Sequence, residues 1–463
     1  MRPLEWLTLL AFLPALLLPL FPRSTLRRGA LDLAALLPLL ATAAQVLLEG
    51  WRAQMVPLYL VAALFVVSRL RARRWAASSA PPHPVRLGGT VLTLALAGAL
   101  PAWLLPVVTL PPPTGPYAVG VVDREIRDPV RKRCLMVSVW YPASKAGTRA
   151  PLTHDPGKVA AGLASSYGVP VAAVLLQHLR YFTSAASPAA PILRGVPPFP
   201  VLVFSHGLMG LRLQNSETFQ ELASRGYVVV ALDHTDAAAV TVFPDGETRL
   251  FNLRRLGIRS EDHEAPGRSL LTALLPIWVA DQRRVYDTLT AWAATDPTFA
   301  GQLDLGQMGS FGHSFGGVTA LEVCRVEVRC RAAANLDGGL PPGGLPPAVR
   351  PVLLMTSAQS NSFGYAIRRW TRYIGSAKTS AVWLELPGSN HYSFTIVPRL
   401  TPLGAPWGYD PAAGSRTVNR YLNAFFDLHL RGVPTRLFDA TPQDRANEAR
   451  AGAVRTRLLQ NAK

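Results

Sequence analysis

The hydrophobic pattern divides the chain into two parts. Residues 1–114 are dominated by leucine and alanine, whereas the rest alternates short apolar runs with amphipathic stretches. A helix needs about 20 apolar residues to cross a bilayer, and few polar positions remain here for the wet face of a soluble bundle, which is the alternative. We therefore predict about four transmembrane helices over residues 1–110. The candidate segments are Leu4 to Phe21, Leu31 to Leu48, roughly Gln54 to Val67, and Leu87 to Leu110.

Downstream, the pattern predicts a proline-rich linker (111–116), a folded region (117–435) and a polar C-terminal tail (436–463). In the folded region, continuous apolar strands alternate with helix-like stretches, which indicates a mostly parallel sheet covered on both faces. Residues 158–197 are interpreted either as a lid or as an ordinary packed insertion. The expected strands are Met136 to Tyr141, Val201 to Phe204, Tyr227 to Leu232, Gln307 to Phe311, Ala332 to Leu336, Pro351 to Thr356 and Ala381 to Leu386.

The strongest chemical signal is a G-x-S-x-G motif at residues 312–316, between an expected strand and a helix-like stretch. That context is typical of a nucleophile elbow, in which Ser314 would present its hydroxyl from a strained turn. Gly312 and Gly316 would let the strand and helix approach closely. The motif alone is weak evidence, because it recurs by chance, so its expected partners must support it.

A serine nucleophile needs a histidine base, and in α/β-hydrolases that histidine follows the serine in the chain. His391 and His429 both follow Ser314. His429 lies in a helix-like stretch and is interpreted as a packed structural residue. His391 follows a strand-like run, where a loop can reach a serine at the same sheet edge. We therefore predict His391 as the base.

The orienting acid should lie between the serine and the histidine. Three of the four acids there lie on the elbow helix, just after it, or in the strand leading to His391: Glu322, Glu327 and Glu385. Asp337 instead ends a strand-like run and precedes two glycines. It is the predicted acid, with a loop-capping aspartate as the alternative.

The oxyanion hole should combine the amide after the nucleophile, Phe315, with one from a loop after an earlier strand. The run from Pro200 to Phe204 is followed by Ser205-His206-Gly207-Leu208, which makes Leu208 the second expected donor. His206 is interpreted as a turn-shaping residue rather than a second base.

These motifs together resemble the platelet-activating factor acetylhydrolase family, the plasma and type II intracellular lipases. The segment Phe204 to Leu208, the elbow Gly312 to Gly317 and the strand end Ala231 to His234 are similar to the family's motifs. Asp337 and His391, at intervals of 23 and 54 residues, fall where the family's acid and histidine are expected. The resemblance covers about residues 117 to 435.

The resemblance implies an α/β-hydrolase fold and a membrane-anchored serine esterase that hydrolyses short or oxidised acyl esters of glycerophospholipids, with no cofactor. Two departures lie near the expected acyl pocket: Gly-Gly-Leu-Pro-Pro after Asp337 without aromatic residues, and a shorter segment from Thr235 to Arg268. A general carboxylesterase, polyester hydrolase or acyltransferase with the same triad is an alternative. A non-catalytic membrane scaffold is the alternative from another class.

The arginines of the expected loops and the cysteines indicate on which side of the membrane the folded region lies. The expected loops after the first and third segments are rich in arginine, so the positive-inside rule places them in the cytoplasm. With four spans, the folded region would lie on the extracytoplasmic side of the plasma membrane. A disulfide between Cys324 and Cys330 would fit that side, although two free thiols fit a cytoplasmic domain.

The formal net charge of +18 suggests attraction to anionic lipid. Nucleic acid is the competing partner, but no recognition motif supports it. No zinc-type cysteine spacing is present, and Asp262, His263 and Glu264 are interpreted as a polar loop rather than a metal site. We therefore expect a lipid or small ester substrate, a bilayer and no nucleic acid.

Overall fold

The computed structural model describes the chain except for residues 18–25, 75–83, 260–269, 404–409, 439–454 and 461–463. Two compact units are present. The helical unit comprises residues 1–108 together with 174–181 and 400–403. The sheet unit comprises the other described residues of 109–463.

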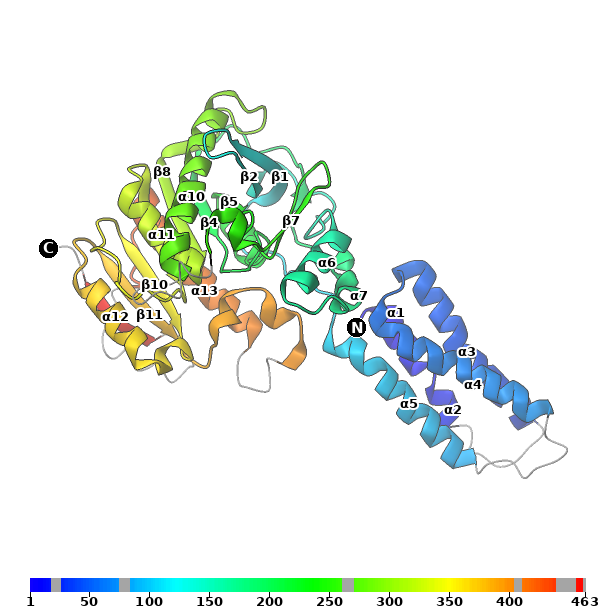
Figure 1. Ribbon diagram of the computed structural model, residues 1–463. Coiled ribbons are helices and arrows are strands. Elements are labelled where there is room, and N and C mark those ends of the chain that lie inside the picture. The colour runs from blue at the N-terminus through cyan, green and yellow to red at the C-terminus, as the bar shows by residue number, and fades with distance from the viewer. Residues whose placement is uncertain (18–25, 75–83, 260–269, 404–409, 439–454, 461–463) are drawn as a thin grey trace. The chain divides into compact units, whose positions relative to one another are not determined.

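The helical unit is built from leucine- and alanine-rich helices, in keeping with the helix propensity of these residues. Its apolar core includes Phe12, Met55, Leu58 and Ala95. Two stretches, Asp32–Glu49 and Ala53–Arg71, are long and apolar enough to cross a membrane by length and composition. The helices are α1 (Pro3–Leu10), α2 (Leu13–Leu17), α3 (Leu26–Glu49), α4 (Val56–Arg74) and α5 (Pro84–Leu104) (Figure 1).

The first apolar segment differs from the single long helix expected over Leu4 to Phe21. The chain turns after α1 and restarts as α2, and the segment then runs into residues outside the described part. Pro14 explains the break, because proline has no N–H to donate back to the preceding turn but is well tolerated at the start of a helix. The longest described helix of the helical unit is instead α3, which accommodates Pro38 in its interior.

A network of buried charges ties the helices together at one end of the helical unit. The Arg52 side chain is fully buried and bonds Glu5 through Nε (2.7 Å) and Nη2 (2.6 Å). Its guanidinium also donates to the carbonyls of Ala102 (3.0 Å) and Leu105 (2.6 Å). The start of α1 and the end of α5 therefore meet beside Arg52, which precedes the short 3-10 helix (Ala53–Met55) that leads into α4. A buried charge is tolerated there because an acidic partner faces it and all three guanidinium nitrogens donate hydrogen bonds.

The sheet unit contains a ten-stranded sheet among its described residues, in the order β12-β11-β10-β9-β8-β4-β5-β2-β1-β3. The six adjacent strands from β11 to β5 are parallel to one another. At the two ends of this group, β12 is antiparallel to β11 and β2 is antiparallel to β5. The main strands are β1 (Ala118–Asp128), β2 (Arg133–Ala143), β4 (Phe199–Ser205), β5 (Val228–Asp233), β8 (Leu303–His313), β9 (Cys330–Leu336), β10 (Val352–Ser357), β11 (Ala381–Leu386) and β12 (Arg455–Gln460), with β3 (Ser187–Pro188) at one edge.

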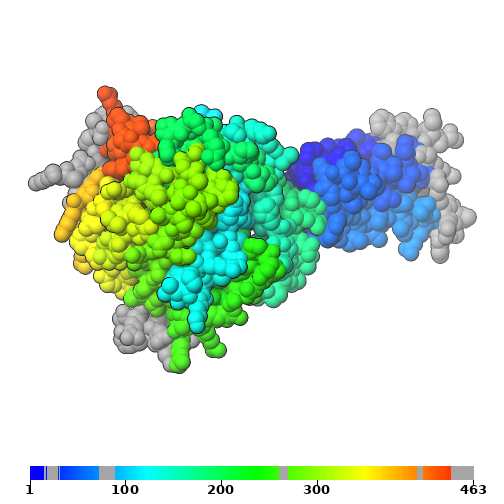
Figure 2. All heavy atoms as spheres, turned by 90° about the horizontal axis from the view of Figure 1, so that it is seen from above, coloured from blue at the N-terminus to red at the C-terminus, as the bar shows by residue number. Residues whose placement is uncertain are grey.

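Helices cover both faces of this sheet (Figure 1). One apolar core packs α10 (Leu270–Thr295), α11 (Phe315–Val326) and α12 (Gly364–Gly375) on one face. A second core packs α8 (Ser216–Ser224) and α13 (Pro411–Arg431) on the other face. Figure 2 shows the β1–β2 hairpin (cyan) packed beside α10 (yellow-green), where Arg284 of α10 donates to the Arg127 carbonyl of β1 (2.9 Å).

These strands form where they do because both faces of the central sheet are buried. All seven residues of β4 are buried, and burying each large aliphatic side chain contributes about 1.5–3 kcal/mol. Each of the seven expected strands is present. The expected mostly parallel, helix-covered sheet is confirmed, and β4, β5 and β8 create a point where strand order reverses, with β5 on one side of β4 and β8 on the other.

Candidate active site

Ser314 occupies the turn between β8 and α11. Its backbone lies at φ 55° and ψ −126°, a conformation that residues other than glycine rarely adopt. The flanking glycines permit the turn to pack: a Cβ on Gly316 would lie 2.1 Å from the Ser205 carbonyl oxygen, and one on Gly312 would lie 2.3 Å from that of Gly316. The strand and helix therefore pass closer together than any larger residue allows, while Ser314 stays partly exposed.

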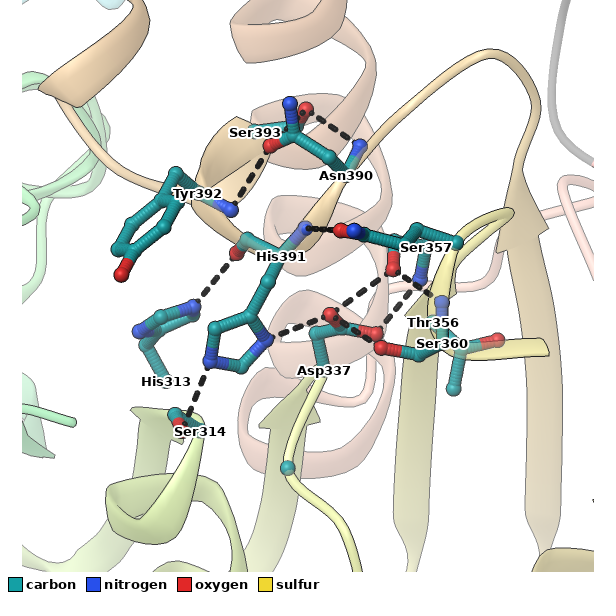
Figure 3. A network of polar contacts seen from close by, with 12 residues as sticks. His313, Ser314, Asp337, Thr356, Ser357, Ser360, Asn390, His391, Tyr392 and Ser393 are labelled. Atoms are coloured by element: carbon teal, nitrogen blue, oxygen red, sulfur yellow. Dashed lines mark hydrogen bonds and ion pairs between the residues drawn. The ribbon is translucent and has the colours of Figure 1, made fainter. Parts of the chain in front are cut away.

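Ser314, His391 and Asp337 form a continuous hydrogen-bonded line (Figure 3). His391 Nε2 lies 2.9 Å from Ser314 Oγ, and His391 Nδ1 lies 2.8 Å from Asp337 Oδ2. Asp337 directly follows β9, and His391 opens a short 3-10 helix, η6 (His391–Phe394), after β11. The Asp337 side chain is fully buried, whereas that of His391 is 35% exposed. A proton on Ser314 Oγ can therefore pass to a ring whose far side is held by a carboxylate.

The Asp337 carboxylate is oriented by donors from the end of the neighbouring strand. Oδ1 accepts from the Ser357 amide (2.7 Å), and Oδ2 accepts from the hydroxyls of Ser357 (2.9 Å) and Ser360 (2.9 Å). These three donors hold the carboxylate in one orientation toward His391. Sequence reasoning missed both serines; the available signal was a polar residue directly after the buried β10 run.

A second histidine, His313, hydrogen-bonds the backbone of His391. His313 Nε2 donates to the His391 carbonyl (2.8 Å), and His313 Nδ1 accepts from Gln214 Nε2 (2.6 Å). Burial lowers the pKa of His313 to about 3, so the ring is neutral at physiological pH. The His391 amide also donates to Gln359 Oε1 (3.2 Å). His391 is thus fixed through its backbone at both ends as well as through its ring.

The expected oxyanion segment lies against the serine. A Cβ on Gly207 would lie 3.1 Å from Ser314 Cβ, so the Gly207–Leu208 turn touches the nucleophile. Phe315 is the first residue of α11, and the first amides of a helix have no acceptor within it. The turn that carries the Leu208 amide therefore lies beside Ser314, and the Phe315 amide directly follows Ser314 in the chain.

The other candidates from the sequence have structural partners. His206 is buried; its Nδ1 donates to the Gly207 carbonyl (2.6 Å) and its Nε2 accepts from the His234 amide (3.0 Å). His429 packs its ring against Phe425, at a centroid distance of 4.8 Å. The remaining acids bond neighbouring side chains: Glu322 to Arg325, Glu327 to Arg329 and Glu385 to Asn361.

Cys324, near the end of α11, and Cys330, at the start of β9, are joined as a disulfide with Cα atoms 4.9 Å apart. Cys134 is a free thiol. Within the described part of the chain, no group of three histidine, cysteine or acidic side chains is arranged to hold a metal ion. Asp262, His263 and Glu264 lie outside the described residues.

Comparison with known proteins finds relatives of this chain. Residues 104–255 match the family model described as "Platelet-activating factor acetylhydrolase, isoform II". The platelet-activating factor acetylhydrolase of Cavia porcellus is 27% identical over 251 residues, covering 51% of this chain and 57% of the relative. The chain is related to the platelet-activating factor acetylhydrolases. The family model covers the β4 strand end and Leu208 but stops before Ser314.

Two further proteins extend this relationship. "Probable 1-alkyl-2-acetylglycerophosphocholine esterase" of Arthroderma benhamiae is 27% identical over 277 residues, covering 54% of this chain and 64% of that protein. A solved ferulic acid esterase from Streptomyces cinnamoneus matches with a TM-score of 0.58 and 27% identity, covering 76% of this chain and all of that one. The sheet unit thus has the α/β-hydrolase fold. The chain spans little more than half the length of the acetylhydrolase from Cavia porcellus.

Proposed function

We propose that this chain is a membrane-anchored serine ester hydrolase that cleaves short or oxidised acyl chains from glycerophospholipids. The observation that carries the proposal is the line from Ser314 through His391 to Asp337, with contacts of 2.9 and 2.8 Å. A partly exposed serine at the head of such a line has its base within hydrogen-bonding reach.

In this mechanism, Ser314 Oγ attacks the ester carbonyl carbon while His391 Nε2 takes its proton. Asp337 keeps the imidazole in the tautomer with Nδ1–H and stabilises the imidazolium. The amides of Leu208 and Phe315 donate to the oxyanion of the tetrahedral intermediate. As the intermediate collapses, His391 protonates the leaving alcohol. Water, deprotonated by His391, then attacks the acyl-serine and releases the carboxylic acid.

The substrate class rests on the relatives, which are named for platelet-activating factor and for 1-alkyl-2-acetylglycerophosphocholine. A second candidate is a carboxylesterase for esters that are not lipids. The likeness to the ferulic acid esterase favours it, because this chain covers the whole of that protein at 27% identity. An acyltransferase would use the same triad with an alcohol in place of water.

We propose further that the helical unit is the membrane anchor. Arg69 pairs with Asp32 (3.1 Å), and the residues between Arg52 and Arg69 rise roughly 25 Å along a helix, close to the thickness of a bilayer core. The arginine-rich ends of α3 and α4 then lie at the face opposite Arg52, which the positive-inside rule assigns to the cytoplasm. Reporter fusions after residues 78 and 115 test this topology: opposite sides are expected, and the same side would refute it.

The function is tested by labelling detergent-extracted protein with a fluorophosphonate probe. Wild type should be labelled and Ser314→Ala should not, while both keep the same melting temperature. Labelling of Ser314→Ala equal to wild type would refute the assignment of the nucleophile.

Kinetic assays with different substrates distinguish the three candidate functions. The phospholipid hypothesis predicts higher kcat/KM for 1-alkyl-2-acetylglycerophosphocholine than for p-nitrophenyl acetate or methyl ferulate. The reverse order would favour the carboxylesterase. Product formed only when an acceptor alcohol is added would favour the acyltransferase.

A further inference from the structure

A second constellation of serine, histidine and aspartate lies in the sheet unit and takes no part in the proposed mechanism. Ser205 Oγ lies 2.9 Å from His234 Nε2, and His234 Nδ1 lies 3.1 Å from Asp281 Oδ2. All three residues have no exposed surface. A substrate cannot reach Ser205, so this constellation cannot supply a nucleophile.

The hydrogen bonds of this group have a defined direction. Asp281 accepts from Arg131 Nη1 (2.7 Å) and Arg133 Nη2 (3.1 Å). Burial alone would raise the pKa of Asp281, but the His234 hydrogen bond and these arginines hold it at about 2. The carboxylate therefore accepts from His234 Nδ1–H, which leaves Nε2 to accept from the Ser205 hydroxyl. Ser205 Oγ in turn accepts from Gln282 Nε2 (2.9 Å).

This group holds the loop that carries the expected Leu208 donor. Ser205 is the last residue of β4 and stands three positions before Leu208. His234 makes two hydrogen bonds to the start of this loop. Its ring accepts from the Ser205 hydroxyl, and its backbone amide donates to His206 Nε2 (3.0 Å). Its ring is neutral, since burial lowers its pKa to about 3. The turn is thus fixed to the end of β5 by two bonds on adjacent residues.

Trp278 connects the same group to the other expected donor. Its ring stacks on His234 at a centroid distance of 3.8 Å and an interplanar angle of 11°. It also meets the ring of His206 (5.1 Å) and the ring of Phe315 (4.7 Å). Trp278, Asp281 and Gln282 lie three and four positions apart on α10, and so share one helical face. One face of α10 therefore supports both segments that would form the oxyanion hole.

We propose that Ser205, His234, Asp281 and Trp278 are positioning residues that fix the separation of the Leu208 and Phe315 amides. This assignment rests on the proposed function. An oxyanion hole works only when its donors are preorganised, and loss of one donor costs about 10²–10³-fold in kcat. A displacement of about 1 Å can cost about 10²-fold. Loosening the loop should therefore lower kcat more than it alters KM.

Ser205→Ala removes one hydroxyl and leaves the nucleophile, base and acid untouched. Tyr141→Phe is the matched control, because it also deletes one buried hydroxyl, which donates to the Ala190 carbonyl (2.8 Å) away from this group. With p-nitrophenyl acetate, Ser205→Ala should lower kcat about 10–100-fold and leave KM within about threefold. Tyr141→Phe should match wild type in both constants.

A thionoester analogue provides the readout that a purely structural role would not move. Sulfur accepts hydrogen bonds more weakly than oxygen, so the kcat loss in Ser205→Ala should be smaller with the thionoester than with the oxygen ester. If Ser205→Ala does not fold, Trp278→Phe tests the same support, with the same expected loss confined to kcat.

The outcomes separate the two proposals. An active wild type with unchanged kcat in Ser205→Ala would overturn the positioning role alone. Equal kcat losses in Ser205→Ala and Tyr141→Phe would overturn it too, by indicating general destabilisation. A folded wild type without ester turnover would refute the proposed function and this assignment with it.

Discussion

Acidification from pH 7 to pH 5 should destabilise the sheet unit strongly, because histidines are buried without charge beneath the active site. His234 and His313 are buried, and burial lowers the pKa of each to about 3. Burial also lowers the pKa of His206. In the unfolded chain each ring returns to a pKa of about 6.5. Below about pH 6.5 the unfolded state thus binds more protons than the folded state. The free energy of unfolding is therefore highest above that pH and falls as the pH drops.

The magnitude follows from the pKa values of His234 and His313. For a pKa of about 3 folded and about 6.5 unfolded, acidification from pH 7 to pH 5 costs about 2 kcal/mol per histidine. His234 and His313 together therefore cost about 4 kcal/mol, against a typical total stability of about 5–15 kcal/mol. At about 2–4 °C per kcal/mol, the melting temperature should fall by roughly 8–16 °C.

Thermal unfolding of the detergent-solubilised full chain at pH 7, 6 and 5 provides the assay. His313→Gln keeps a donor for the His391 carbonyl but cannot titrate, so its melting temperature should fall by about 4–8 °C less than that of wild type. His154→Gln is the matched control, because His154 is exposed, and it should keep the wild-type fall. A wild-type melting temperature unchanged between pH 7 and pH 5, or a full fall in His313→Gln, would refute this reasoning.

Two further predictions concern the catalytic geometry. Asp337→Asn should lower kcat about 10³–10⁴-fold while leaving the melting temperature within a few degrees, as ester assays and thermal unfolding would show; a loss under tenfold would contradict the role of Asp337. Gly316→Ala places a Cβ 2.1 Å from a backbone carbonyl oxygen, so it should lower the free energy of unfolding by at least about 1–3 kcal/mol and abolish activity. Gly339→Ala is the control, because Gly339 has open space around it, and it should change neither stability nor activity. Equal stability of the two variants would contradict the packing argument.

The sequence predicts the sheet unit well where strands are buried on both faces. β4 and β5 are continuous apolar runs, so their pattern marks them without reference to the rest of the chain. β1 was not predicted, because its Asp123-Arg124-Glu125 stretch interrupts the apolar pattern near the sheet edge. β12 lies in what was expected to be a polar tail, and it forms by pairing with β11. Partners distant in sequence decide such strands, and local pattern does not contain them.

The candidate site divides in the same way. Ser314, Asp337 and His391 each follow a recognisable strand, and parallel strands bring their carboxyl ends to one sheet edge. Their hydrogen-bonded line matches the sequence expectation, while their catalytic roles remain predictions. Ser357 and Gln214 orient these groups through contacts between segments far apart in the chain. Neither belongs to a motif, so only the assembled fold reveals them.

The two serine–histidine–aspartate constellations show why residue identity and contact distance do not define a nucleophile. In each, the serine oxygen lies 2.9 Å from a histidine Nε2, and the other ring nitrogen faces a carboxylate. Ser205 lies within a strand and has no exposed surface, whereas Ser314 lies in a turn at φ 55° and is partly exposed. Under the two proposals above, geometry of the same kind supports a loop in one case and presents a hydroxyl to substrate in the other. The two serines therefore differ in solvent access and in backbone conformation.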